Sequence, residues 1–239
     1  MRVLGMFARR PEPGKTKTRL AATLGNELAA ELYAAFVSDL LTRVPPLGDC
    51  FLLGVTPADE GTQAWFRQRT PASSLILSQP EVDLGGRIDW FFHRAAEQGG
   101  QPCVLIGSDS PDLPDTHITA AFEALQTADL VLAPAADGGY VLIGLNRPIP
   151  ELFEDLPWST AATLTATIQR ATHLGLRTRL IDPWYDVDTI HNLGTLLPRL
   201  TCSAGQGNAT DTPVAGDAPQ TRQTLLRYAD IITEHLRHH

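Results

Sequence analysis

The segment that decides the fold class is Cys103-Val-Leu-Ile-Gly-Ser-Asp109. Its first four residues are apolar, and a glycine, a serine and an aspartate follow directly. A short apolar run that ends in such a turn is typical of a strand buried in a parallel sheet. Apolar residues then recur at helical spacing over 116–125, so the segment predicts one strand-helix unit of an α/β protein.

The same alternation continues on both sides of this segment. Apolar runs predict strands at 2–7, 51–55, 75–77, 130–132, 140–143 and 177–181. Apolar residues at helical spacing predict helices at 25–44, 58–69, 85–96 and 161–174. Repeated strand-helix units predict a three-layer α/β/α fold, in which helices cover both faces of an open, mainly parallel sheet.

The length of 239 residues suits one such core, which we expect over residues 1–200. Residues 201–220 are rich in Ser, Thr, Gly, Ala, Asp and Pro without an apolar period, and this composition predicts a flexible linker. Residues 221–239 return to helical spacing. They predict a short amphipathic helix that docks on the core or on the second subunit of a homodimer.

Composition excludes several classes of function. A formal net charge of −8 argues against a general nucleic-acid or membrane surface. No stretch approaches the roughly 20 apolar residues of a spanning helix, and the start of the chain lacks the pattern of a signal peptide, so we expect a cytoplasmic protein. The three cysteines are far apart, which predicts neither disulfides nor a zinc site.

Positive charge is concentrated in one short loop after the first predicted strand. Five cations fall within residues 9–19, and both lysines of the chain are among them. In open α/β sheets such a loop faces the ligand site, where a glycine permits close approach of a phosphate and cations neutralise it. The expected phosphate-binding residues are Arg9, Pro13, Gly14, Lys15, Lys17, Thr18 and Arg19. The alternative is a solvated basic loop.

Two well-known nucleotide motifs do not fit this loop. Gly14-Lys15-Thr16 imitates the end of a P-loop, but that motif requires a glycine at the position of Arg9. Pro11 and Pro13 also remove two amide donors from any phosphate cradle. No GxGxxG follows the first strand, which argues against a Rossmann dinucleotide site.

Aspartates at two places predict a divalent metal site. Asp109 follows a buried strand, and Asp186 and Asp188 point the same way if their segment is extended. Mg²⁺ or Mn²⁺ is commonly held by one or two such carboxylates together with substrate phosphates. The alternatives are that Asp109 and Asp112 cap the next turn and that Asp188 is a helix N-cap. A haloacid-dehalogenase motif at 186–190 is weak, because Ile190 stands where Thr or Val belongs.

Three further stretches are expected to be either local turns or walls of a substrate pocket. The first, Pro134–Gly144, contains two glycines between predicted strands. The others, Asp83–Arg87 and Pro157–Thr160, precede predicted helices. The candidate pocket residues in these stretches are Asp137, Gly138, Gly139, Trp158 and Ser159, and Arg87 is a further candidate phosphate ligand.

These stretches together resemble the DUF2064 family, which is also described as glycosyltransferases associated with arsenosugar and radical-SAM gene neighbourhoods. The resemblance covers about residues 1–200 and rests on PEPGKTKTRL, DLGGR, IGSDSPDLP, PAADGGYVLIGL, PWST and YDVDT, in that order. Arg9 stands where the family pattern has a lysine, which keeps the charge but changes the hydrogen-bond geometry. The resemblance implies a GT-A fold of the nucleotide-diphospho-sugar transferase superfamily. It also implies a metal on Asp109 with Asp186 or Asp188.

The expected function is metal-dependent transfer from a nucleotide-activated donor to a small-molecule acceptor. In it, Asp109, Lys17 and Arg19 would stabilise charge on the leaving group. A nucleotide sugar as donor would make the protein a glycosyltransferase. A nucleoside triphosphate would make it a nucleotidyltransferase that acts on a phosphorylated small molecule. A non-catalytic nucleotide-binding module is the alternative from another class.

Overall fold

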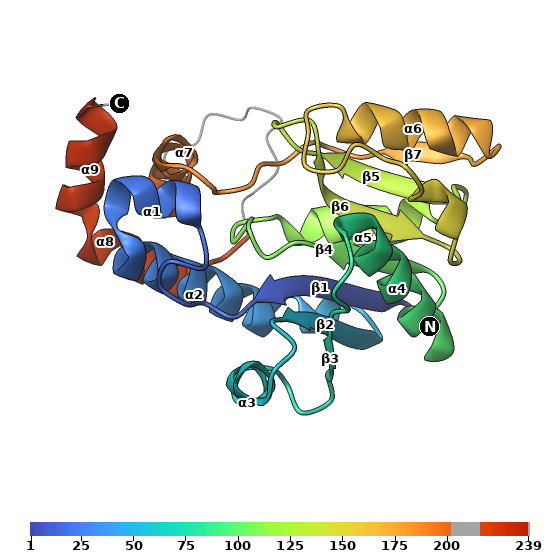
Figure 1. Ribbon diagram of the computed structural model, residues 1–239, viewed down its shortest axis with the longest axis horizontal. Coiled ribbons are helices and arrows are strands. Elements are labelled where there is room, and N and C mark those ends of the chain that lie inside the picture. The colour runs from blue at the N-terminus through green and yellow to red at the C-terminus, as the bar shows by residue number, and fades with distance from the viewer. Residues whose placement is uncertain (202–215, 239) are drawn as a thin grey trace.

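The computed structural model describes residues 1–201 and 216–238, and a seven-stranded sheet forms its centre (Figure 1). The strand order is β3-β2-β1-β4-β6-β5-β7, and only β6 runs antiparallel to its neighbours. The strands are β1 (Val3–Arg9), β2 (Cys50–Thr56), β3 (Leu75–Ser78), β4 (Cys103–Ile106), β5 (Leu130–Pro134), β6 (Tyr140–Leu145) and β7 (Thr178–Leu180). The predicted mainly parallel α/β sheet is therefore confirmed.

Helices cover both faces of this sheet. They are α1 (Thr18–Leu24), α2 (Asn26–Arg43), α3 (Glu60–Arg67), α4 (Leu84–Glu97), α5 (Asp115–Ala124), α6 (Thr163–His173), α7 (Ile190–Thr201), α8 (Pro219–Arg227) and α9 (Ala229–His238). Two short 3-10 turns lie at Pro45–Leu47 and Pro150–Leu152. The sequence pattern missed α1, which is separated from α2 by Gly25 at φ +83.

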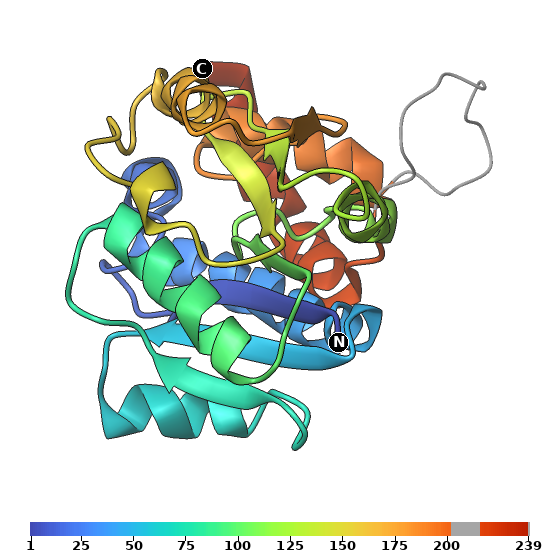
Figure 2. The ribbon, with the colours of Figure 1, turned by 90° about the vertical axis from the view of Figure 1, so that its right-hand side faces the viewer.

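The core has two halves because successive side chains of a strand point to opposite faces of the sheet. Leu4 and Met6 of β1 pack in one half, to which α2, α5 and α7 contribute. Val3 packs in the other half, to which α4 and α6 contribute. Helices α2 and α4 accordingly lie on opposite faces of the sheet (Figure 2).

The chain after α7 returns to the main body. Residues 202–215, which include most of the predicted linker, lie outside the described residues. The last predicted linker residues, 219 and 220, begin α8 instead. The single helix predicted at 221–239 is two helices, because the backbone leaves the helical conformation at Tyr228 (φ −110, ψ 17). Buried Leu225 and Ile232 join the core half that contains α2.

The ends of two parallel strands determine where the site lies. β1 and β4 are neighbours, with Val3 opposite Cys103 and Met6 opposite Ile106. The loops that follow them, residues 10–17 and 107–114, therefore leave the same edge of the sheet side by side. In the described part of the chain, no helix combines the length and apolar character needed to cross a membrane.

Candidate functional site

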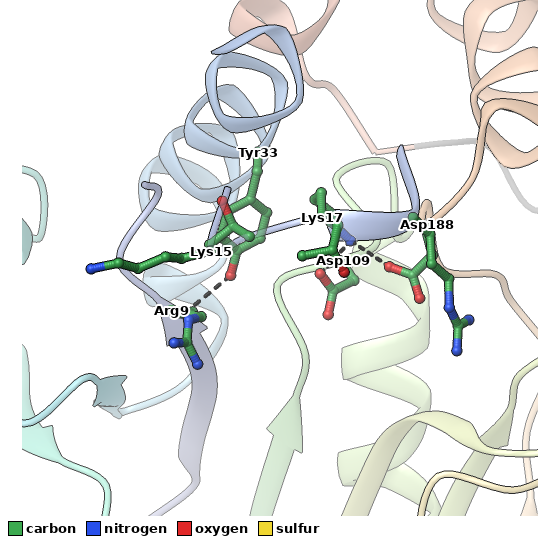
Figure 3. Close-up of a pocket in the computed structure, with 9 residues that line it drawn as sticks. Arg9, Lys15, Lys17, Tyr33, Asp109 and Asp188 are labelled. Carbon is green, nitrogen blue, oxygen red and sulfur yellow. Dashed lines mark hydrogen bonds and ion pairs between the residues drawn. The ribbon is translucent and has the colours of Figure 1, made fainter. Parts of the chain in front are cut away.

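The loop between β1 and α1 folds back on itself and sends its two lysines in different directions. Gly14 has a positive φ of 74°, and the Lys15 amide and the Thr16 hydroxyl both donate to the carbonyl of Glu12, each at 3.1 Å. The Lys15 ammonium pairs with Glu12 at 2.9 Å and is 64% exposed. Figure 3 shows Lys15 pointing away from the aspartates and Lys17 pointing toward them.

Lys17 is a buried cation between two acids from distant parts of the chain. Its side chain is 3% exposed, and its Nζ contacts Asp109 and, at 2.8 Å, Oδ1 of Asp188. Nζ also lies 5.5 Å from the ring centre of Tyr33 and 5.9 Å from that of Phe36. Burial alone would lower the pKa of Lys17, but the two carboxylates outweigh it and raise that pKa, so the side chain is an ammonium at neutral pH.

Tyr33 of α2 joins the loop ends behind Lys17. Its hydroxyl lies 2.7 Å from the Oγ atom of Ser108 and accepts a 3.1 Å hydrogen bond from the backbone amide of Arg9. Burial raises the pKa of Tyr33 to about 12. The neutral hydroxyl thereby holds the carboxyl end of β1 against the loop after β4.

The segment that carries Asp186 and Asp188 is docked beside Asp109 by main-chain and side-chain bonds. The Val187 amide donates to the carbonyl of Asp109 at 2.9 Å. The Ser110 hydroxyl lies 2.8 Å from both the Tyr185 carbonyl and an Asp186 oxygen. Burial first, and then the charge of Asp109, raises the pKa of Asp186 to about 6. Three carboxylates thus gather at one edge of the sheet.

Asp112 does not join this group of carboxylates, although it belongs to the same loop as Asp109. It is fully buried and accepts from Trp184 Nε1 at 3.3 Å, Tyr185 Oη at 2.7 Å and Arg199 Nε at 3.1 Å. Helix α5 is capped by Pro114 without any side-chain hydrogen bond. Neither Asp109 nor Asp112 therefore caps this helix, and Asp112 anchors α7 and the segment before it.

Two polar cavities meet at the aspartates. The smaller, of about 260 Å³, is lined by Arg9, Lys15, Thr16, Lys17, Thr18, Arg19, Tyr33, Asp109 and Asp188. The larger, of about 510 Å³, is lined by Arg19, Leu84, Asp109, Asp137, Gly139, Tyr140, Trp158, Ser159, Thr160, Ala161, Thr163, Asp186 and Asp188. Arg19, Asp109 and Asp188 line both, so the two cavities adjoin at these residues.

A third, mainly apolar cavity of about 240 Å³ opens on the same aspartates from the α4 side of the sheet. Its walls are the end of β1, the first turns of α4 and the strands β4 and β6. Asp109 and Asp186 are its only charged lining residues among those that the structure describes. It offers an apolar surface beside the polar site.

Several predicted site residues lie outside these cavities. Pro13 and Gly14 shape the loop without lining a cavity, and Arg87 donates to the Val82 carbonyl at 2.8 Å on the surface. Gly138 has φ +89, and a β-carbon there would come within 2.3 Å of the Ala161 carbonyl oxygen. This glycine therefore lets the β5–β6 turn pack against the loop that carries Trp158 and Ser159, instead of forming the pocket floor.

The residues of the site that were not predicted from the sequence include Thr16, Tyr33, Ser110 and Tyr140. Tyr33 belongs to the apolar face of α2, and nothing in its spacing separates it from a core aromatic residue. Ser110 lies in the loop that contains Asp109, where a serine next to a proline is typical of a turn. Only contacts between distant segments distinguish these residues.

The carboxylates suit a metal that completes its shell from substrate. Within residues 1–201 and 216–238, no three His, Cys, Asp or Glu side chains are arranged to hold a metal ion. Asp109 and Asp188, however, are 43% and 41% exposed, and both line the same cavity. Mg²⁺ is usually bound by one or two carboxylates plus substrate phosphates, and these two residues fit that pattern.

Known structures share this fold. A candidate nucleotide-diphospho-sugar transferase from Desulfovibrio desulfuricans G20 is 29% identical, with a TM-score of 0.86 over 98% of this chain and 99% of that chain. The inositol-1-phosphate CTP transferase of T. maritima is 15% identical, with a TM-score of 0.56 over 88% and 98%. A CMP:2-keto-3-deoxy-manno-octonic acid synthetase in complex with CTP is 10% identical, with a TM-score of 0.50 over 82% and 97%.

The comparisons of sequence match one family and a shorter part of the chain. No curated protein matches the chain. Residues 49–160 match the family described as "Uncharacterized protein conserved in bacteria (DUF2064)". This match confirms the predicted resemblance to the DUF2064 family over residues 49–160. The likeness to the Desulfovibrio protein shows the fold of the nucleotide-diphospho-sugar transferases.

Proposed function

We propose that this protein is a metal-dependent glycosyltransferase that uses a nucleotide sugar as donor. The observation that carries the proposal is the cavity in which Arg9, Arg19 and Lys17 face Asp109 and Asp188. Cations beside a carboxylate pair, at the carboxyl ends of parallel strands, suit a diphosphate bound together with Mg²⁺ or Mn²⁺. The phosphates of the donor would occupy this smaller cavity, and the acceptor would occupy the larger one.

Each group has a defined part in this proposal. Asp109 and Asp188 would hold the metal, which supplies charge stabilisation at the phosphate oxygens when bound. Arg9 and Arg19 would bind and orient the diphosphate and offset the charge that develops on it as the bond to the sugar breaks. Asp186 lines only the larger of the two polar cavities and already accepts from Ser110, so we assign the metal to Asp188 rather than to Asp186.

The charge of the larger cavity favours an uncharged acceptor. Four aspartates line it, at positions 109, 137, 186 and 188, and Arg19 is the only basic residue among its described lining residues. Arg19 and a divalent cation together carry three positive charges against these four carboxylates, so the lining has no surplus of positive charge to attract a phosphorylated acceptor. Trp158 adds a flat apolar surface on which a sugar ring or another hydroxyl-bearing ring could lie. These features support glycosyl transfer over nucleotidyl transfer to a phosphorylated molecule.

The test is incubation of the protein with Mg²⁺ and two panels of donors, nucleotide sugars and nucleoside triphosphates. Release of nucleoside diphosphate from a nucleotide sugar supports the proposal. Release of pyrophosphate from a nucleoside triphosphate would instead assign nucleotidyl transfer. Tight nucleotide binding by calorimetry without turnover of any donor would identify a non-catalytic binding module and overturn the proposal.

Replacement of Asp109 tests the metal assignment directly. Asp109→Asn should weaken Mg²⁺-dependent nucleoside diphosphate binding by about tenfold or more, because one charged ligand to the metal is lost. Asp137→Asn is the matched control, since Asp137 lines only the larger cavity. Calorimetry of both variants with and without Mg²⁺ measures the effect. Equal Mg²⁺-dependent affinity in Asp109→Asn and wild type would refute the metal assignment.

A further inference from the structure

The ammonium of Lys17 is almost completely enclosed by acids and aromatic rings. Two carboxylates contact Nζ, the rings of Tyr33 and Phe36 lie beside it, and only 3% of the side chain is exposed. Asp109 lies in the loop after β4, and Asp188 lies in the segment before α7. Among the described residues, no other cation is paired with either of them. Lys17 is therefore their counter-ion in this structure (Figure 3).

A divalent metal on the same two carboxylates would meet this ammonium. Both contacts of Nζ use the Oδ1 atoms of the acids, so a metal that shares these acids would lie within a few ångströms of a fixed positive charge. Repulsion between such charges is strong at a site of reduced solvent access. Each cation therefore weakens the binding of the other to the carboxylate pair.

When an anion occupies the smaller cavity, the Lys17 ammonium has a second place to bind. The ammonium borders the smaller cavity, whose other described basic lining residues are Arg9, Lys15 and Arg19. Lys17 has a left-handed backbone conformation (φ 49) at the start of α1, in a loop that also contains Gly14 at positive φ. An anion in the cavity would attract Nζ from the aspartates toward the phosphate oxygens.

We propose that Lys17 is the resident counter-ion of the Asp109–Asp188 pair, and that a polyphosphate anion must draw it out before a divalent metal binds there. Metal and anion then bind cooperatively, and free metal binds weakly. The inference rests on the proposed function, because it places the metal on the same two aspartates. It differs from that function in concerning the binding order at the site and not the reaction.

The first experiment measures Mn²⁺ affinity in the absence of any nucleotide, by calorimetry or electron paramagnetic resonance. Lys17→Met removes the competing charge while keeping an unbranched side chain, so it should bind Mn²⁺ about tenfold or more tightly than wild type. The matched control is Lys15→Met, which removes the only other lysine, an exposed one paired with Glu12. Its Mn²⁺ affinity should stay at the wild-type value.

Unchanged or weaker Mn²⁺ binding in Lys17→Met would overturn the proposal, because the lysine would then organise the aspartates without competing for them. The measured affinity does not depend on catalysis. Should no donor be turned over while Lys17→Met binds Mn²⁺ more tightly, the proposed function fails and this inference stands. Should a nucleotide sugar be turned over while the Mn²⁺ affinity of the variant is unchanged, the proposed function stands and this inference fails.

A second experiment uses the wild-type protein, so it does not depend on the folding of a variant. Because the chain has only two lysines, lysine labelled with ¹³C and ¹⁵N gives one signal each for Lys15 and Lys17 in an NMR spectrum. Inorganic pyrophosphate with Mg²⁺ should shift the Lys17 side-chain signal, whereas Mg²⁺ alone at the same concentration should leave it in place. No pyrophosphate-dependent shift of Lys17, or an equal shift with Mg²⁺ alone, contradicts the proposal.

Discussion

At the scale of single residues, a buried tyrosine hydroxyl connects two strand ends that carry the site. Tyr33 accepts from the Arg9 amide and lies within hydrogen-bond distance of Ser108, the residue before Asp109. Its ring also borders the Lys17 ammonium. One side chain of α2 thus positions both the basic loop and the first aspartate.

Tyr33→Phe should destabilise the protein by about 1 kcal/mol, because the Arg9 amide and the Ser108 hydroxyl lose a buried partner. Denaturant unfolding followed by circular dichroism measures the change. Tyr228→Phe is the matched control, since the Tyr228 hydroxyl bonds to Glu31 near the surface. The control should change stability by less than about 0.5 kcal/mol. Equal losses of stability in the two variants would show that the Tyr33 hydroxyl contributes no more to the fold than the Tyr228 hydroxyl does.

At the scale of elements, the edge strand β7 is held to β5 by one ion pair as well as by its short ladder. Asp129, which precedes β5, accepts from the backbone amide of Arg177 at 2.9 Å and from its Nε and a terminal nitrogen at 3.0 and 2.9 Å. These bonds lower the pKa of Asp129 to about 2. β7 leads into the segment that delivers Asp186 and Asp188, so this tie also supports the site.

Asp129→Asn should lower the free energy of unfolding at pH 7 by about 1 kcal/mol or less, because the pair is largely solvent-exposed and screened. A carboxylate whose pKa is lower in the folded state stabilises the fold above its unfolded pKa of about 4. That stabilisation is lost as the pH falls toward 2. Unfolding curves at pH 7 and pH 3 should therefore show a smaller gap in unfolding free energy between variant and wild type at pH 3. A gap that does not change with pH would exclude the ion pair as its cause.

At the scale of the whole molecule, the C-terminal helices complete the face of the sheet that α2 covers. The buried carboxylate of Asp39 on α2 accepts from the amides of Gln220 and Thr221 at 3.0 and 2.7 Å, at the start of α8. α8 and α9 lie beside α2 and α1 at the left of Figure 1. The same helix α2 therefore contacts Lys17 through Tyr33 and the C-terminal segment through Asp39.

Asp39→Ala should lower the free energy of unfolding by about 1–2 kcal/mol, the usual effect of removing a side chain that caps a helix start. The amides of residues 220–227 should exchange with deuterium faster in this variant, as measured by mass spectrometry. Asp39→Asn keeps one acceptor oxygen and should have a smaller effect. Unchanged exchange of these amides in Asp39→Ala would show that α8 is held by its apolar contacts alone.

Local sequence pattern alone determined most of the architecture. Apart from α1, the strands and helices between residues 2 and 181 were predicted within a few residues, because apolar periodicity reflects which side of each element is buried. The loop after the first strand and Asp109 after the fourth were expected on the same grounds, since a ligand site in an open α/β sheet lies at the carboxyl ends of strands.

Only the tertiary structure decided which charged groups meet. Lys17 and Asp188 are 171 residues apart in the chain, and their contact depends on how β1, β4 and α7 are arranged. Asp112 and Asp109 stand in one loop, yet one is buried against Arg199 and the other lines a cavity. Partner choice between distant segments is a property of packing, and no local pattern of residues encodes it.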